Sequence, residues 1–141
     1  MNKKQIVLAA LMIGATINLS QAQSFYPLLK EYSAAKKERV DKVFSTSLGS
    51  GHNGFIESTL TIVTKMKLDL PDDEFPLIKN EIDNLVVNGT TPVVRYKAYL
   101  AAAVFANPTM FKGEAAHQYS NPEAFFSELA ERMTKTLLSS I

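Results

Sequence analysis

The sequence predicts an all-α protein, a compact bundle of about five helices. Apolar residues recur at helical spacing along most of the chain, and an N-capping residue followed by proline occurs twice, at Thr91-Pro92 and Asn121-Pro122. No stretch offers a convincing partner for a β-strand, whose backbone groups would stay unpaired. The expected helices cover residues 27–46, 54–69, 73–88, 92–106 and 122–139.

Residues 1–22 are predicted to be a secretory signal peptide. Lys3 and Lys4 form a positive N-terminal region, and residues 6–17 form an apolar run that is too short for the roughly 20 residues that span a bilayer. Small residues precede the expected cleavage point after Ala22, and no cysteine follows that would anchor a bacterial lipoprotein. An uncleaved anchor is the alternative. We therefore expect an exported bacterial protein, periplasmic or extracellular, with no membrane span after cleavage.

The expected mature chain, residues 23–141, is predicted to form a single helical domain. Removing Lys3 and Lys4 from the 15 basic residues leaves 13 against 14 acidic residues, so the net charge is near −1. This balance lacks the basic footprint of a nucleic-acid-binding protein. The sequence contains no cysteine, which excludes disulfides, thiolate zinc sites and cysteine nucleophiles. The hydrophobic core must therefore hold the exported protein together.

The first expected helix, 27–46, has an approximate apolar stripe and a mildly basic, solvated outer face. The stripe consists of Leu29, Tyr32, Val40, Val43 and Phe44. The glycine-rich segment 47–54 follows, and it lacks the Gly-Lys-Ser/Thr ending of a P-loop. We interpret it as a connection in which Asn53 is the N-cap of the next helix.

The segment 55–70 fits two patterns. Apolar and polar residues alternate from Leu60 to Leu70, as in a half-buried strand, whereas Ile56, Leu60 and Val63 also satisfy helical spacing. Because a lone strand would leave its backbone groups unpaired, we expect a helix.

The third expected helix has signals at both ends. Pro71-Asp72-Asp73-Glu74 is typical of a helix start, since acidic residues stabilise the positive end of the helix dipole. Asn88-Gly89 is expected to end the helix, with the glycine in a left-handed conformation.

The last two expected helices share a start signal, an N-cap residue followed by proline. Thr91-Pro92 begins helix 92–106, whose apolar side chains occupy nearly every face and therefore predict a buried central helix. Asn121-Pro122 begins helix 122–139. The apolar side of that helix consists of Phe125, Phe126, Leu129, Met133 and Leu137.

The helix pair within about residues 72–107 resembles a HEAT-type repeat. The resemblance rests on Pro92, Val94, Arg95, Ala98 and Ala101, which follow an amphipathic helix and a tight Asn-Gly turn. In that family the arginine hydrogen-bonds within the turn and between neighbouring repeats, and the alanines permit close helix packing. Since repeat arrays usually need about three units, the resemblance implies one HEAT-like antiparallel helix pair inside a bundle.

Residues able to do chemistry are few. His52 and His117 lie in expected loops without the spacing of a zinc site, and no Gly-x-Ser-x-Gly nucleophile motif occurs. We interpret the acidic run 72–74 as compensating a helix dipole rather than as a catalytic or calcium site. Arg95 is interpreted as a turn hydrogen-bond donor rather than an anion ligand. The sequence therefore predicts no catalytic residues, no metal site and no cofactor, and a protein that is not an enzyme.

The expected function is protein interaction, for example that of an inhibitor or immunity-type protein that neutralises a toxin in the periplasm. A groove beside the 73–106 hairpin would have an acidic rim that steers a basic protein partner. The expected interaction face consists of Asp72, Asp73, Glu74, Glu81, Asp83 and Arg95.

Two alternatives stay open at this point. The irregular segment 108–120 is long for a loop in a compact domain, and such loops are often functional. A small enzyme or ligand binder would use its His117 and Tyr119, together with Arg95. The other alternative is a structural homo-oligomer.

Overall fold

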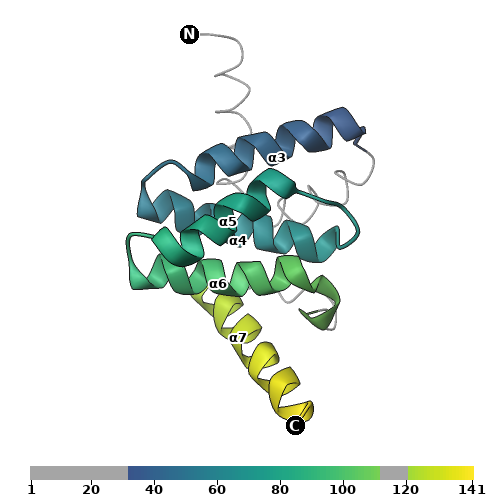
Figure 1. Cartoon of the computed structure of the whole chain (residues 1–141), viewed down its shortest axis with the longest axis vertical. Coiled ribbons are helices and arrows are strands. Elements are labelled where there is room, and N and C mark those ends of the chain that lie inside the picture. The colour runs from purple at the N-terminus through teal and green to yellow at the C-terminus, as the bar shows by residue number, and fades with distance from the viewer. Residues whose placement is uncertain (1–31, 112–120) are drawn as a thin grey trace. The chain divides into compact units, whose positions relative to one another are not determined.

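The computed structural model describes residues 32–111 and 121–141 (Figure 1). These ranges contain five α-helices and one 3-10 helix. They are α3 (Ala34–Leu48), α4 (Asn53–Asp69), α5 (Pro76–Asn88), α6 (Pro92–Ala106), η1 (Pro108–Phe111) and α7 (Pro122–Ser139). No strand occurs in these two ranges, and the predicted all-α fold class is confirmed. The chain divides into two units, Met1–Ser33 and Ala34–Ile141, and all of these helices belong to the second.

The first four helices enclose the hydrophobic core. Helix α3 packs against α4 and α5, and α6 packs against the same two helices. Within this group, each helix therefore contacts two of the other three. Helix α7 and η1 pack against each other and against α4 and α6. The largest fully buried apolar side chains are Leu48, Leu60, Val63, Met66, Ile78, Ile82, Val94, Leu100, Val104 and Phe125. None of the described helices is long and apolar enough to cross a membrane.

Three of the expected helices are confirmed closely. Helices α6 and α7 have the expected bounds, and α4 shows that residues 55–69 form a helix rather than a strand. Both expected N-caps are present: Thr91 Oγ1 accepts a hydrogen bond from the Val94 N–H at 3.1 Å, and Asn121 Oδ1 accepts one from the Ala124 N–H at 2.8 Å. Local sequence is enough here because the cap and the proline act within one helical turn.

The predicted boundaries of the first helix and the predicted cap of the second were wrong. Helix α3 begins at Ala34 and continues to Leu48, so it includes residues expected to lie in the glycine-rich connection. The expected residues 27–31 lie outside the described part. The N-cap of α4 is His52, and Asn53 is already helical; the Asn53 side chain instead accepts a hydrogen bond from the Thr90 hydroxyl at 2.6 Å.

The start of α5 differs from the prediction, which placed acidic residues in its first turn. The helix begins at Pro76, so the acidic run 72–74 precedes it, and its N-cap residue makes no side-chain cap. Asp41 of α3 takes this role instead. Its carboxylate accepts hydrogen bonds from the backbone N–H groups of Leu77, at 3.0 Å, and Ile78, at 2.8 Å. A buried carboxylate from another helix therefore satisfies the positive end of α5.

Gly89 ends α5, but for a reason other than the predicted one. Its φ of −54° lies outside the left-handed region, so its backbone conformation does not require glycine. A Cβ at this position would lie 2.7 Å from the Leu85 carbonyl oxygen and 3.0 Å from side-chain carbons of Arg95 and Val94. Glycine is needed because a carbonyl oxygen in the last turn of α5 and two side chains of α6 leave no room for a Cβ.

The prediction that α6 is buried nearly all round was also wrong. Val94, Leu100 and Val104 are buried, whereas Tyr96 and Tyr99 are about half exposed, at 53% and 49%. Apolar and aromatic composition alone could not distinguish a helix surrounded by protein from one with an uncharged face toward solvent.

We expect Gly89→Ala to lower the free energy of unfolding by about 1–3 kcal/mol, because the added methyl group has no room beside Leu85, Val94 and Arg95. The matched control is Gly54→Ala in the first turn of α4, where a Cβ meets no atom within 4 Å. Alanine there should raise the free energy of unfolding by about 0.5–1 kcal/mol. Urea denaturation of both variants measures the difference, and effects of the same sign would contradict the steric explanation.

We expect Asp41→Ala to lower the free energy of unfolding by about 2 kcal/mol, because it removes the cap of α5 and leaves the N–H groups of Leu77 and the buried Ile78 without their acceptor. Glu38→Ala, an exposed acidic position on the same helix, should change it by no more than about 0.5 kcal/mol. Equal stabilities of the two variants would show that the cap contributes nothing.

Candidate functional site

The acidic residues predicted to form an interaction face lie in different settings. Asp73, in the turn between α4 and α5, binds Lys37 of α3 through its carboxylate at 2.7 Å. Its carbonyl oxygen accepts a hydrogen bond from the buried Lys67 ammonium at 2.7 Å. Its neighbours Asp72 and Glu74 are exposed. Only these two of the three carboxylates are therefore directed to solvent.

The two acidic residues within α5 add little charge to that turn. Asp83 forms an exposed ion pair with Lys79 one helical turn away, at 2.6 Å. Glu81 is half-buried and lies beside Gly49, just after α3. The predicted acidic rim is thus divided between a solvated turn, an ion pair and a contact with the α3 end.

Arg95 lies at the other end of α5 from the acidic turn. Its Nη1 donates a hydrogen bond of 2.6 Å to the carbonyl oxygen of Gly89, and its side chain is half-buried. The expected turn hydrogen bond is therefore present. Since α5 is about 20 Å long, Arg95 does not share a site with the run 72–74.

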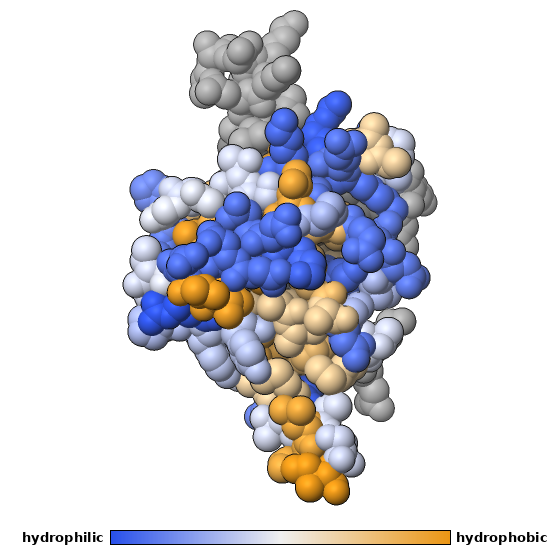
Figure 2. All heavy atoms as spheres, viewed as in Figure 1, coloured by the Kyte–Doolittle hydropathy of each residue, from blue (hydrophilic) through white to orange (hydrophobic). Residues whose placement is uncertain are grey.

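The structure shows a further candidate surface that the sequence did not predict. It is the solvent-exposed side of α6, which we call the α6 face. It consists of Pro92, Tyr96, Tyr99, Ala103 and Ala106, which recur at helical spacing and are exposed or half-exposed. Figure 2 shows mostly hydrophilic surface over α3 and α5, and paler to hydrophobic surface over α6. The α6 face contains no charged residue.

The α6 face is uncharged because its positions carry proline, tyrosine and alanine, and the two charged residues of α6 make contacts within the protein. Arg95 binds the turn carbonyl, as described above. Lys97 is buried, and its ammonium lies 2.7 Å from Glu57 Oε2 of α4 and 3.1 Å from Glu123 Oε1 of α7. It also lies over the ring of Phe126, 5.6 Å from the centroid. Lys97 therefore joins three helices instead of solvating the surface of its own.

Sequence reasoning missed the role of Lys97. Its partners lie 40 and 26 residues away in the chain, and no local motif links them. The only signal was a lysine on an otherwise apolar helix, and that signal does not say which carboxylates would bind it.

The ion pairs shift the pKa of both Lys97 and Glu123. Burial acts to lower the pKa of Lys97, but the hydrogen bonds and charges of Glu57 and Glu123 outweigh it and raise the pKa above its ordinary value. The hydrogen bond from Lys97 lowers the pKa of Glu123. Both groups are therefore held in their charged forms at neutral pH.

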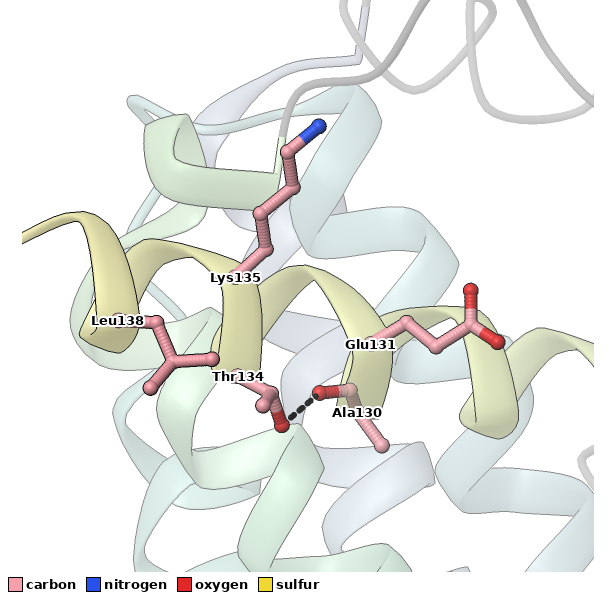
Figure 3. A pocket seen from close by; sticks show the side chains of 5 residues that line it. All are labelled: Ala130, Glu131, Thr134, Lys135 and Leu138. Carbon is pink, nitrogen blue, oxygen red and sulfur yellow. Dashed lines mark hydrogen bonds between the residues drawn. The ribbon is translucent and has the colours of Figure 1, made fainter.

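The structure describes a shallow depression on α7 (Figure 3). It is lined by Ala130, Glu131, Thr134, Lys135 and Leu138, all from this one helix. The Thr134 hydroxyl binds the Ala130 carbonyl oxygen of its own helix at 2.9 Å. Polar groups do not converge on this depression as they do in a small-molecule site.

The predicted histidine positions add no site to the described residues. His52 is exposed at the start of α4. His117 and Tyr119, the alternative loop site, lie outside the described residues. Within the described ranges, no group of three or more histidine, aspartate or glutamate side chains is placed to hold a metal ion.

We expect Lys97→Met to lower the free energy of unfolding by about 1.5–3 kcal/mol at neutral pH, because it removes hydrogen bonds between charged groups that join α4, α6 and α7. Lys79→Met is the matched control. It breaks an exposed pair and should cost at most about 0.5 kcal/mol. A Lys97→Met protein as stable as the control would exclude a structural role for the ion pairs.

The difference in the free energy of unfolding between Lys97→Met and the unmodified protein should depend on pH in a defined way. The raised pKa of Lys97 means that its contribution is complete below about pH 10.4 and is lost as the pH rises through the higher folded value. The lowered pKa of Glu123 means that its contribution is complete above about pH 4.3 and is lost as the pH falls through the lower folded value. Urea denaturation across this range should show a plateau at neutral pH, whereas a slope there would contradict the assignment.

Comparison with known proteins finds no matching family model, no similar curated protein and no similar solved structure.

Proposed function

We propose that the protein is a small exported module that binds another protein through the α6 face. The observation that carries this proposal is the uncharged aromatic surface of α6, on a helix whose two cationic residues both bind internally. Export is proposed from the signal-peptide pattern of residues 1–22. The protein acts in this proposal by binding alone, without catalysis or a cofactor.

The chemistry of the α6 face suits a protein partner. The centres of protein interfaces are depleted in charged residues and enriched in tyrosine, which offers a large contact area and a hydroxyl group for hydrogen bonding. Tyr96 and Tyr99 supply this area, while Ala103 and Ala106 allow a partner to approach the helix closely. The partner would present an apolar or aromatic surface that covers the two rings.

The acidic turn adds a charge preference to the proposal. Asp72 and Glu74 are exposed and form no ion pair with other described residues. Their charge would speed the association of a basic partner without contributing the main contact area. A partner with a basic rim around an apolar centre therefore fits best, as an inhibitor or immunity-type role would require.

The proposed helix-repeat character rests on the α5–α6 pair. The two helices are antiparallel neighbours joined by a short turn, and the Arg95 hydrogen bond to Gly89 is the turn contact that the HEAT resemblance implies. This contact supports the proposal that the pair is HEAT-like, and surfaces of such helix pairs serve in protein binding.

The experiment is capture of a partner from periplasmic and secreted fractions of the source organism, followed by affinity measurement with the purified partner. We expect Tyr96→Ser/Tyr99→Ser to weaken binding at least about tenfold, because buried tyrosines are frequent hot spots. Val87→Ser on α5 is the matched control, since Val87 is also an exposed apolar residue. It should leave the affinity unchanged.

The acidic turn is tested separately with Asp72→Lys/Glu74→Lys. This variant should slow association most at low ionic strength and leave the dissociation rate nearly unchanged. A partner that binds the double tyrosine variant as tightly as the unmodified protein would overturn the assignment of the α6 face, and failure to capture any partner would count against the binding function.

A further inference from the structure

Two asparagines in the sequence are followed by glycine, and the structure places both at the same end of the helix bundle. They are Asn53, the first residue of α4, and Asn88, the last residue of α5. The Thr90 hydroxyl, two residues after Asn88, donates a hydrogen bond of 2.6 Å to Asn53 Oδ1. The two Asn–Gly pairs are therefore close in space, but their local surroundings differ.

An Asn–Gly pair can deamidate without an enzyme. The peptide nitrogen of the glycine loses its proton and attacks the side-chain carbonyl carbon of the asparagine. The bond from that carbon to the side-chain nitrogen breaks, ammonia leaves, and a five-membered succinimide remains. Water then opens the ring at either carbonyl and yields aspartate or isoaspartate, so that an amide and one water become a carboxylate and ammonia. Glycine favours the attack because no Cβ shields its nitrogen.

The fold blocks this reaction at Asn88. The Gly89 N–H donates a hydrogen bond of 2.9 Å to the Leu85 carbonyl oxygen, and Gly89 is buried. The Asn88 side chain is also held, because its Nδ2 donates a hydrogen bond of 2.7 Å to Asn84 Oδ1. The nitrogen of Gly89 can therefore reach the Asn88 side chain only when the last turn of α5 opens and leaves its contacts with α6.

The pair at the start of α4 lacks this protection. Gly54 is exposed, and a Cβ at its position would meet no atom within 4 Å. Its N–H precedes the first backbone hydrogen bond of the helix, which Ile56 donates to the His52 carbonyl oxygen. The N-cap residue His52 makes no side-chain cap, and the hydrogen bond between Thr90 and Asn53 is exposed to solvent. Opening the first turn of α4 therefore costs little free energy, as at other fraying ends.

We propose that Asn53 is a site of spontaneous deamidation in the folded protein, whereas Asn88 is protected until α5 opens. Aspartate at position 53 still accepts the Thr90 hydrogen bond and places a negative charge at the positive end of α4. Isoaspartate adds a methylene group to the main chain and disrupts the first turn. The reaction thus gives two forms of the protein that differ in charge and in the start of α4. This inference does not depend on the proposed partner at the α6 face.

The test is incubation of the purified protein at mildly alkaline pH, with and without guanidinium chloride, followed by mass spectrometry of tryptic peptides. Trypsin releases the two sites in separate peptides, 43–65 and 80–95. Both sites should convert at similar rates in denaturant. In the folded protein, conversion at Asn88 should fall at least about a hundredfold, whereas conversion at Asn53 should stay within about tenfold of its rate in denaturant. Equal rates at the two sites in the folded protein, or no conversion at Asn53, would overturn the proposal.

Two variants test the chemistry and its consequence. Gly54→Ala should abolish conversion at Asn53 over the same period, in denaturant as well as in the folded protein, because the methyl group shields the attacking nitrogen. Conversion at Asn88 in denaturant should be unchanged and is the internal control, and continued conversion at Asn53 would exclude the Gly54 nitrogen as the attacking group. Asn53→Asp reproduces the first product and should raise the midpoint of denaturation. A lower midpoint would contradict a product that fits the fold.

Discussion

The hydrogen bonds between the Asp41 carboxylate and the first N–H groups of α5 fix the start of α5 against α3. They place a negative charge from α3 at the positive end of α5, and the charge is buried with two donors satisfying it. Because α5 packs against α3 on one side and α6 on the other, its position also determines that of α6. A shift of α5 along its axis would leave the buried carboxylate unpaired, which is costly.

Two lysines, Lys67 and Lys97, are buried as well, and each has polar partners inside the protein. Lys67 binds the carbonyl oxygens of Pro71 and Asp73 and so closes the turn before α5, while Lys97 binds carboxylates from α4 and α7. Both extend an aliphatic stem through the apolar interior to reach a polar partner. Lys97 lies on the buried side of α6, opposite the uncharged α6 face.

The sequence alone determined the helical class, the position of α4 and the bounds of α6 and α7, because apolar periodicity, N-caps and prolines act over a few residues. It also indicated Arg95 as a turn donor and Gly89 as the end of α5, although for the wrong conformational reason. Only the tertiary structure decided that Asp41 caps α5, that Asp73 is engaged in an ion pair with Lys37, and that Lys97 is buried while Tyr96 and Tyr99 are exposed. These features depend on which helices pack together, and partners 36 to 40 residues apart leave no periodic signal in the chain.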